Sequence, residues 1–136
     1  MAIEVDSRTP TVRVIDSSAI LAILFDETGA EKAKQLGAGG VISSVNLYEI
    51  ISKCGSKDFS PDDVMDFLDG SGYSIASFDE AMAIIAADIK RLDSTKNLSL
   101  ADCACLACAI SLGMEIVTAD RAWTELPLPC KIHVIR

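Results

Sequence analysis

The chain has 136 residues, of which 50% are hydrophobic, and its formal net charge is −8, so it has the composition of a globular protein but not the basic charge typical of proteins that bind nucleic acids. Its longest apolar runs, 19–25 and 103–110, are shorter than the about 20 residues that span a bilayer. We expect one cytoplasmic domain, residues 1–136, whose residues 1–10 form a flexible segment without the apolar stretch of a secretory signal.

The first half of the chain predicts short strands that alternate with helices. Ser17 or Ser18 is expected to cap the first helix, and Ser60, followed by a proline and two acids, is a strong helix start. Glycines and an Asp-rich turn separate the segments. The expected strands are 11–15, 41–43 and 73–76, and the expected helices are 19–24, 30–36, 47–54 and 61–70.

The second half predicts an amphipathic helix over 79–92 and a helix that begins at Ser99 and ends before Gly113. Two strands, 115–118 and 131–135, follow with a short helix between them at 121–126. Because the strands are short and mostly separated by helices, they predict an α/β fold with a central, mostly parallel sheet of about five strands.

Four carboxylates stand where an expected strand gives way to a loop or helix, or just inside the following helix: Asp16, Glu49, Asp102 and Asp120. The carboxyl ends of parallel strands collect at one sheet edge, where ligands bind, so these side chains are expected to meet there. Carboxylates repel one another, and a hard divalent cation compensates for that repulsion. The pattern therefore favours metal-assisted phosphate chemistry.

Each carboxylate also has a local explanation. Asp102 completes a Ser-x-x-Asp capping box, and Glu49 stands four residues before a lysine with which it predicts an ion pair. Asp120 could begin a turn, and Asp16 could cap a helix. The cluster is the preferred interpretation because it explains why all four acids fall at the same predicted edge.

The cysteines predict core packing. Their number, five, is odd, and three of them fall in one expected helix, which favours a reduced setting over a disulfide framework. Cys103 and Cys105 point to different sides of that helix, so a soft-metal site is disfavoured.

Four segments, 14–22, 43–50, 98–107 and 116–123, resemble the PIN domain and, more narrowly, the VapC-type toxin of a toxin–antitoxin pair. No single segment is decisive, but their order and spacing are specific, and the likeness runs from about residue 11 to the C-terminus. The resemblance implies a three-layer α/β/α fold. It further implies an endoribonuclease that depends on Mg²⁺ or Mn²⁺ and is the toxin of a type II toxin–antitoxin system.

On the matching positions, the resemblance makes Asp16, Glu49, Asp102 and Asp120 both the catalytic and the metal-binding set, and makes Thr118 a supporting hydroxyl. It also implies a homodimer and an antitoxin partner with a basic segment. Whether one or two metal ions bind, and whether Glu49 or Asp102 activates the water, stays open. The alternative is a PIN-like module that binds a basic protein partner or RNA without cleaving it.

Substrate contacts are harder to read. Asn46 matches a polar position of the second segment, but a helix cap explains it equally well. Ordinary surface charge likewise explains each basic residue of a possible RNA-binding rim. The rim candidates are Arg121, Lys53, Lys57, Lys90, Arg91 and Lys96.

Overall fold

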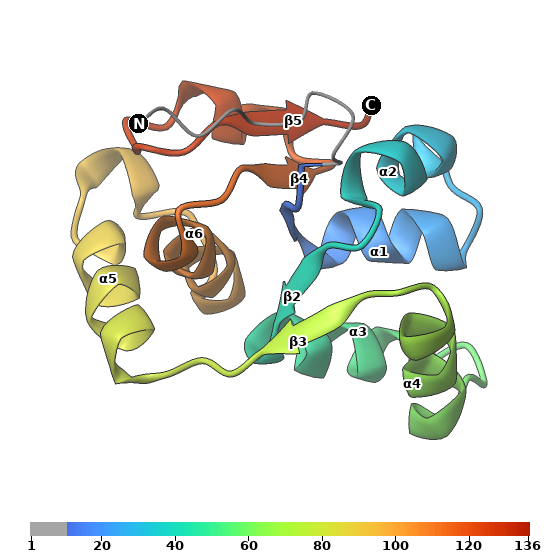
Figure 1. Ribbon diagram of the computed structural model, residues 1–136. Coiled ribbons are helices and arrows are strands. Elements are labelled where there is room, and N and C mark those ends of the chain that lie inside the picture. The colour runs from blue at the N-terminus through green and yellow to red at the C-terminus, as the bar shows by residue number, and fades with distance from the viewer. Residues whose placement is uncertain (1–10) are drawn as a thin grey trace, which may run out of the picture.

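The computed structural model describes residues 11–136, so the segment 1–10, which we expect to be flexible, lies outside the described residues. The described chain forms one sheet flanked by helices (Figure 1). Its strands are β1 (Val14–Ile15), β2 (Val41–Ser43), β3 (Ser74–Ala76), β4 (Ile116–Thr118) and β5 (Ile132–Val134). Its α-helices are α1 (Ser17–Leu24), α2 (Ala30–Gly37), α3 (Ser44–Gly55), α4 (Pro61–Gly70), α5 (Glu80–Lys90) and α6 (Leu100–Leu112). The 3-10 helices η1 (Asp93–Thr95) and η2 (Arg121–Glu125) complete the set.

The five strands form a parallel sheet in the order β3-β2-β1-β4-β5. The chain starts at the central strand β1, adds β2 and β3 on one side, and then crosses to add β4 and β5 on the other. Strand order therefore reverses between β1 and β4, where Ile15 pairs with Val117. In open parallel sheets this reversal point is where ligands bind, beyond the carboxyl ends of the strands.

Two apolar cores lie on opposite faces of the sheet and give it three layers. Ile15 belongs to the core formed with helices α1 to α4, whereas its neighbour Val14 belongs to the core formed with α5 and α6. Successive residues of a strand point to opposite faces, so this two-residue strand supports both cores. Trp123 fills the second core and is only 1% exposed, as expected for core packing.

The predicted order of strands and helices and the α/β class are confirmed, and the differences lie at the ends of elements. The first strand begins at Val14 rather than at residue 11. The third helix begins at Ser44 instead of residue 47, because the Ser43 hydroxyl accepts a hydrogen bond from Val45 N (3.3 Å) and caps the helix directly after β2. The segment 121–126 is a 3-10 helix.

The expected cap of the first helix was wrong. Asp16 is the N-cap residue of α1, with no hydrogen bond from its side chain to the helix backbone. Ser17 and Ser18 are the first helical residues, and their hydroxyls turn toward carboxylates instead of backbone N–H groups.

The cysteines pack as core residues. All five are free, four of them are buried, and Cys130 is half-buried. Burial raises the pKa of each thiol, so the thiols stay protonated at neutral pH. Within residues 11–136, no helix is long and apolar enough to cross a lipid bilayer.

Gly40, which precedes β2, tests how closely the chain packs beside the central strand. A Cβ at this position would lie 2.6 Å from Ile15 Cδ1 and 2.7 Å from the Arg13 carbonyl oxygen. We expect Gly40→Ala to lower the free energy of unfolding by about 1–3 kcal/mol in urea titrations, because the backbone must shift. The control is Gly70→Ala in α4, where the new methyl meets nothing within 4 Å and should be neutral or mildly stabilising. Equal stability of the two variants would contradict the packing argument.

Candidate functional site

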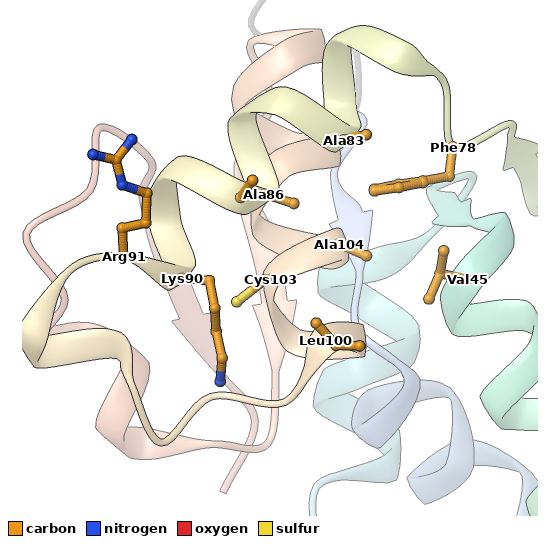
Figure 2. A pocket seen from close by; sticks show the side chains of 10 residues that line it. Val45, Phe78, Ala83, Ala86, Lys90, Arg91, Leu100, Cys103 and Ala104 are labelled. Carbon is orange, nitrogen blue, oxygen red and sulfur yellow. The ribbon is translucent and has the colours of Figure 1, made fainter.

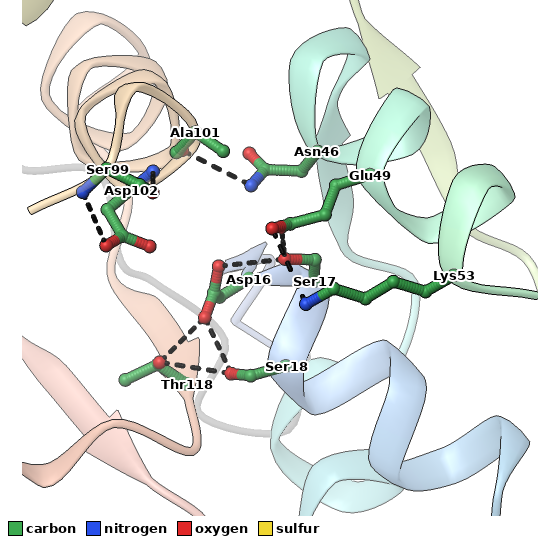
Figure 3. Close-up of polar contacts among 10 residues, drawn as sticks. All are labelled: Asp16, Ser17, Ser18, Asn46, Glu49, Lys53, Ser99, Ala101, Asp102 and Thr118. Carbon is green, nitrogen blue, oxygen red and sulfur yellow. Dashed lines mark hydrogen bonds and ion pairs between the residues drawn. The ribbon is translucent and has the colours of Figure 1, made fainter.

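Asp16 is the centre of the candidate site and lies between β1 and α1, only 4% exposed. Two hydroxyls donate to its Oδ2: Ser18 Oγ at 2.6 Å and Thr118 Oγ1 at 2.9 Å (Figure 3). Ser18 Oγ also accepts a hydrogen bond from Ala119 N at 2.9 Å. These bonds hold the carboxylate where β1 ends beside β4.

Thr118 connects Asp16 with Asp120. Its Oγ1 donates to Asp16 and accepts a hydrogen bond from Asp120 N at 3.1 Å, so a single hydroxyl joins the two acids that follow neighbouring strands. The Asp120 side chain caps η2, because its Oδ1 accepts a hydrogen bond from Ala122 N at 3.0 Å. The turn expected locally at Asp120 and its place beside Asp16 are therefore both present.

Glu49 approaches Asp16 from α3. Ser17 Oγ donates to Glu49 Oε1 and lies 3.5 Å from Asp16 Oδ1, so this hydroxyl stands between the two carboxylates. The other oxygen, Glu49 Oε2, is 3.6 Å from Lys53 Nζ one turn further along the helix. The ion pair predicted from the spacing is thus formed, and it leaves Glu49 at the site rather than turned away from it (Figure 3).

Asp102 comes from the first turn of α6 and forms the predicted capping box. Its Oδ2 accepts a hydrogen bond from Ser99 N at 3.0 Å, and its own N–H donates to Ser99 Oγ at 3.0 Å. Its carboxylate lies on the side of α6 that faces Asp16 (Figure 3). It also lines a hollow of about 380 Å³ together with Asp120, so these two acids border one concavity.

Asn46 fastens α3 to the start of α6. It is fully buried, and its Nδ2 donates to the Ala101 carbonyl oxygen at 3.3 Å, next to Asp102. Its Oδ1 has no hydrogen-bond partner among the described residues. The helix cap that the sequence allowed for Asn46 was wrong, because Ser43 takes that role.

The negative charges at the site influence one another. Burial raises the pKa of Asp16 to about 6; the hydrogen bonds from Ser18 and Thr118 lower it, and the charges of Asp102 and Glu49 raise it further. A buried carboxylate that feels two others favours either a proton or a cation. This response is the clearest physical sign that the acids share one site.

The donor chemistry of the four carboxylates fits a hard divalent cation, because Mg²⁺ and Mn²⁺ prefer oxygen ligands. As the side chains lie, however, no three His, Cys, Asp or Glu residues within 11–136 converge closely enough to hold an ion. The local bonds explain the spread, since Asp102 and Asp120 each cap a helix and Glu49 pairs with Lys53. Each cap occupies one oxygen of its carboxylate.

The remaining predicted contact, Arg121, lies at the surface beside Asp120, and its Nε donates to the Arg136 carbonyl oxygen at 2.7 Å. Two residues of the site, Ser17 and Ser18, were missed, because from the sequence they were interpreted only as helix caps. Their position directly after Asp16 was the available signal, since a hydroxyl can serve a carboxylate as well as a helix end.

Comparison with known proteins gives a family match. A model of the PIN domain matches residues 13–128, most of the chain. Among curated proteins, no relative matches.

Several solved structures share the fold. DNA-bound VapBC from Salmonella typhimurium superposes with a TM-score of 0.69 at 21% identity and covers 93% of this chain and 99% of that one. VapBC2 from Rickettsia felis, bound to a DNA fragment from its promoter, has a TM-score of 0.67 at 17% identity, covering 93% and 100%. A toxin–antitoxin complex from Klebsiella pneumoniae has a TM-score of 0.67 at 15% identity, covering 85% and 92%. At these identities the likeness shows the fold.

The raised pKa of Asp16 predicts how stability depends on pH in the absence of metal. Between the ordinary value of 3.8 and about 6, the folded protein retains a proton that the unfolded chain has lost, so stability falls as pH rises through this range. At 1.36 kcal/mol per pKa unit, the full cost above pH 6 is about 3 kcal/mol. We therefore expect Asp16→Asn to raise the free energy of unfolding by about 1–3 kcal/mol at pH 7.5 and to change it little at pH 4, measured by urea titration in EDTA.

The matched control for this experiment is Asp69→Asn, which neutralises an exposed acid in α4. It should change stability by less than about 0.5 kcal/mol at either pH. A loss of stability in Asp16→Asn at pH 7.5 would show that the ionised carboxylate is compensated and that burial does not dominate its pKa.

Proposed function

Because the chain belongs to the PIN domain family, we propose that it is a metal-dependent endoribonuclease of the VapC type, the toxin of a type II toxin–antitoxin pair. The observation that carries this proposal is the buried Asp16 carboxylate, at the reversal point of a parallel sheet, with two further acids close enough to raise its pKa. The fold likeness to VapBC and toxin–antitoxin structures supports the same assignment.

In this proposal Asp16, Glu49, Asp102 and Asp120 hold Mg²⁺ or Mn²⁺. When bound, such an ion lowers the pKa of a water molecule and stabilises the charge that develops on the phosphate. The oxygens that are not used in the caps of Asp102 and Asp120 supply ligand positions, and the cation replaces the proton that Asp16 otherwise favours.

The chain's own residues orient the reaction. Ser18 and Thr118 both donate to Asp16 Oδ2, which holds the carboxylate with Oδ1 on the side of Glu49 (Figure 3). Ser17 links the same Oδ1 to Glu49. Glu49 or Asp102 orients the attacking water or accepts its proton, because both reach the site from helices. Such positioning of reacting groups supplies a large part of the rate in phosphoryl chemistry.

A groove between α1 and α4 favours a protein partner as a second role. It has a volume of about 580 Å³, and its walls combine apolar side chains with three acids. An amphipathic basic helix complements both features, since its apolar face fills the groove and its cations face the acids. We propose that the antitoxin docks here. The groove is lined by Ile23, Leu24, Phe59, Val64 and Phe67, with Asp58, Asp63 and Asp66 at its rim.

A second copy of the chain is the proposed occupant of another apolar surface, next to α5 and α6. A hollow of about 560 Å³ there is lined mainly by Ala, Val, Leu and Phe side chains (Figure 2). Leu100 is 78% exposed at its edge, and Ile84 on α5 is 58% exposed. Exposed apolar surface of this kind is typical of protein interfaces. It supports the homodimer that the family resemblance implies.

The catalytic assignment predicts that Asp16→Asn and Asp120→Asn each lower the rate of RNA cleavage by at least about 100-fold, since even residues that only support a metal ligand cost roughly 10- to 100-fold. The measurement is cleavage of a defined set of RNAs with Mn²⁺, and EDTA should abolish it in the parent protein. Asp69→Asn, with the same change of charge on α4, should retain full activity. Normal Mn²⁺-dependent cleavage by both site variants would refute the assignment.

The partner assignment predicts that Asp66→Lys weakens binding of a basic antitoxin by about 10-fold or more, because it places like charges opposite each other at the rim of the groove. The probe is the small protein with a basic segment encoded next to this chain, and its Kd is measured by titration calorimetry. Asp69→Lys, three residues further along α4 and outside the groove lining, is the matched control. Equal losses in the two variants would place the partner elsewhere.

A further inference from the structure

Two neighbouring hollows beside the carboxylates are bordered by basic residues. The first, of about 350 Å³, includes Lys53, Lys57 and Arg136 in its lining. The second, of about 400 Å³, includes Lys32, Arg121 and again Arg136. We call these five residues the basic path: Lys57, Lys53, Arg136, Lys32 and Arg121.

The basic path is continuous with the site. Ser18, which donates to Asp16, also lines the first hollow, and Arg136 lines both hollows. Arg121 directly follows Asp120 in the chain and donates to the Arg136 carbonyl oxygen. The C-terminal end of the chain lies beside α2 (Figure 1), where the Arg136 guanidinium donates to the Thr28 carbonyl oxygen at 3.1 Å. The cations therefore form a row that starts at the carboxylates.

The charge of this row contrasts with the rest of the protein. Five of the 12 Lys and Arg residues line the two hollows, with Glu27 as the only acid in either lining. The groove between α1 and α4 has three acids and no cation in its lining, and so does the hollow beside Asp102 and Asp120. In a chain of net charge −8, this separation concentrates the positive field on one side of the site.

The other basic residues suggested by the sequence do not extend the row. The Lys90 ammonium donates to the carbonyl oxygens of Lys96 and Leu98 and so closes the loop before α6. Arg91 pairs with Asp88 at 3.6 Å. Lys90 and Arg91 border the apolar hollow of α5 and α6 rather than the carboxylates (Figure 2).

The cations of the basic path are oriented without being consumed. Lys57 Nζ lies 4.9 Å from the centre of the Phe25 ring, which positions the ammonium but takes none of its hydrogen-bond donors. Arg136 Nη1 is 3.6 Å from Glu27 Oε1, and Lys53 Nζ is 3.6 Å from Glu49 Oε2. Arginine has five N–H donors and lysine has three, so each side chain can still bind a phosphate oxygen.

We propose that the basic path binds the sugar–phosphate backbone of one RNA strand on one side of the bond that is cleaved. This proposal rests on the proposed ribonuclease function and names the surface through which an acidic protein holds its polyanionic substrate. A single row of cations matches one backbone, because a duplex presents two rows of phosphates. The contacts are to phosphates, so they supply affinity and direction and leave sequence choice to other residues.

The test is the salt dependence of RNA binding by Lys57→Gln/Arg136→Gln, made in the non-cleaving Asp16→Asn background. The probe is a fluorescently labelled, unstructured 12-nucleotide RNA in Mg²⁺ at salt concentrations from 50 to 400 mM. Each phosphate contact to a single strand contributes about 0.7 to the slope of log K against log salt. Loss of two contacts should lower the slope by about 1.4 and weaken binding about 25-fold at 0.1 M salt relative to 1 M.

The matched control is Lys34→Gln/Lys131→Gln in the same background. It removes the same charge from exposed residues outside both hollows, and Lys131 precedes β5 whereas Arg136 follows it. Thermal melting of both double variants checks that the fold is retained. The proposal is supported if only the Lys57/Arg136 pair loses slope. It is overturned if both pairs change the slope equally, or if the first pair weakens binding of a basic-path competitor such as oligoglutamate while RNA binding is unchanged.

Cleavage by the protein with Asp16 intact separates this proposal from the proposed function. If that protein cleaves RNA but the Lys57→Gln/Arg136→Gln pair binds with the parent slope, the basic path is wrong and the nuclease assignment stands. If no RNA is cleaved with Mn²⁺ but the slope falls as expected, the path binds RNA and the nuclease assignment fails.

Discussion

The arrangement depends on one buried carboxylate at the place where strand order reverses. Asp16 follows β1, the central strand, and the hydroxyls of Ser18 and Thr118 hold it against the end of β4. Burial without a cation is unfavourable for an ionised carboxylate, and the raised pKa measures that cost. The same cost makes the position suited to a divalent ion, because the ion's charge compensates for desolvation and for the neighbouring acids together.

The parallel sheet brings the other acids to this point through different elements. Glu49 and Asp102 enter from the first turns of α3 and α6, whereas Asp120 follows β4 directly. Each also serves its own element, as an ion-pair partner or as a cap. Structural and functional roles therefore do not exclude each other here. The bonds that hold the side chains in the absence of metal also explain why they stand apart.

Charge is distributed over the surface in separate regions rather than evenly. Acids surround the groove between α1 and α4, cations surround the two hollows next to Ser18, and apolar residues dominate the hollow beside α5 and α6. A protein of net charge −8 can offer complementary surfaces to a basic protein, to RNA and to a second copy of itself only through such separation. The carboxylates lie where the acidic and basic regions meet.

The sequence by itself determined the alternation of strands and helices, the parallel sheet and the four acids, because hydrophobic periodicity, caps and strand exits are local signals. It did not determine that Ser17 and Ser18 bond to carboxylates, since a serine before an apolar helix is equally suited to a cap. Asn46 shows the same limit, because its bond to Ala101 joins residues 55 positions apart. Only the tertiary structure separated Lys53, Lys57 and Arg121 from the cations beside α5, because proximity between distant segments depends on how the helices pack on the sheet. It also placed Arg136 between them.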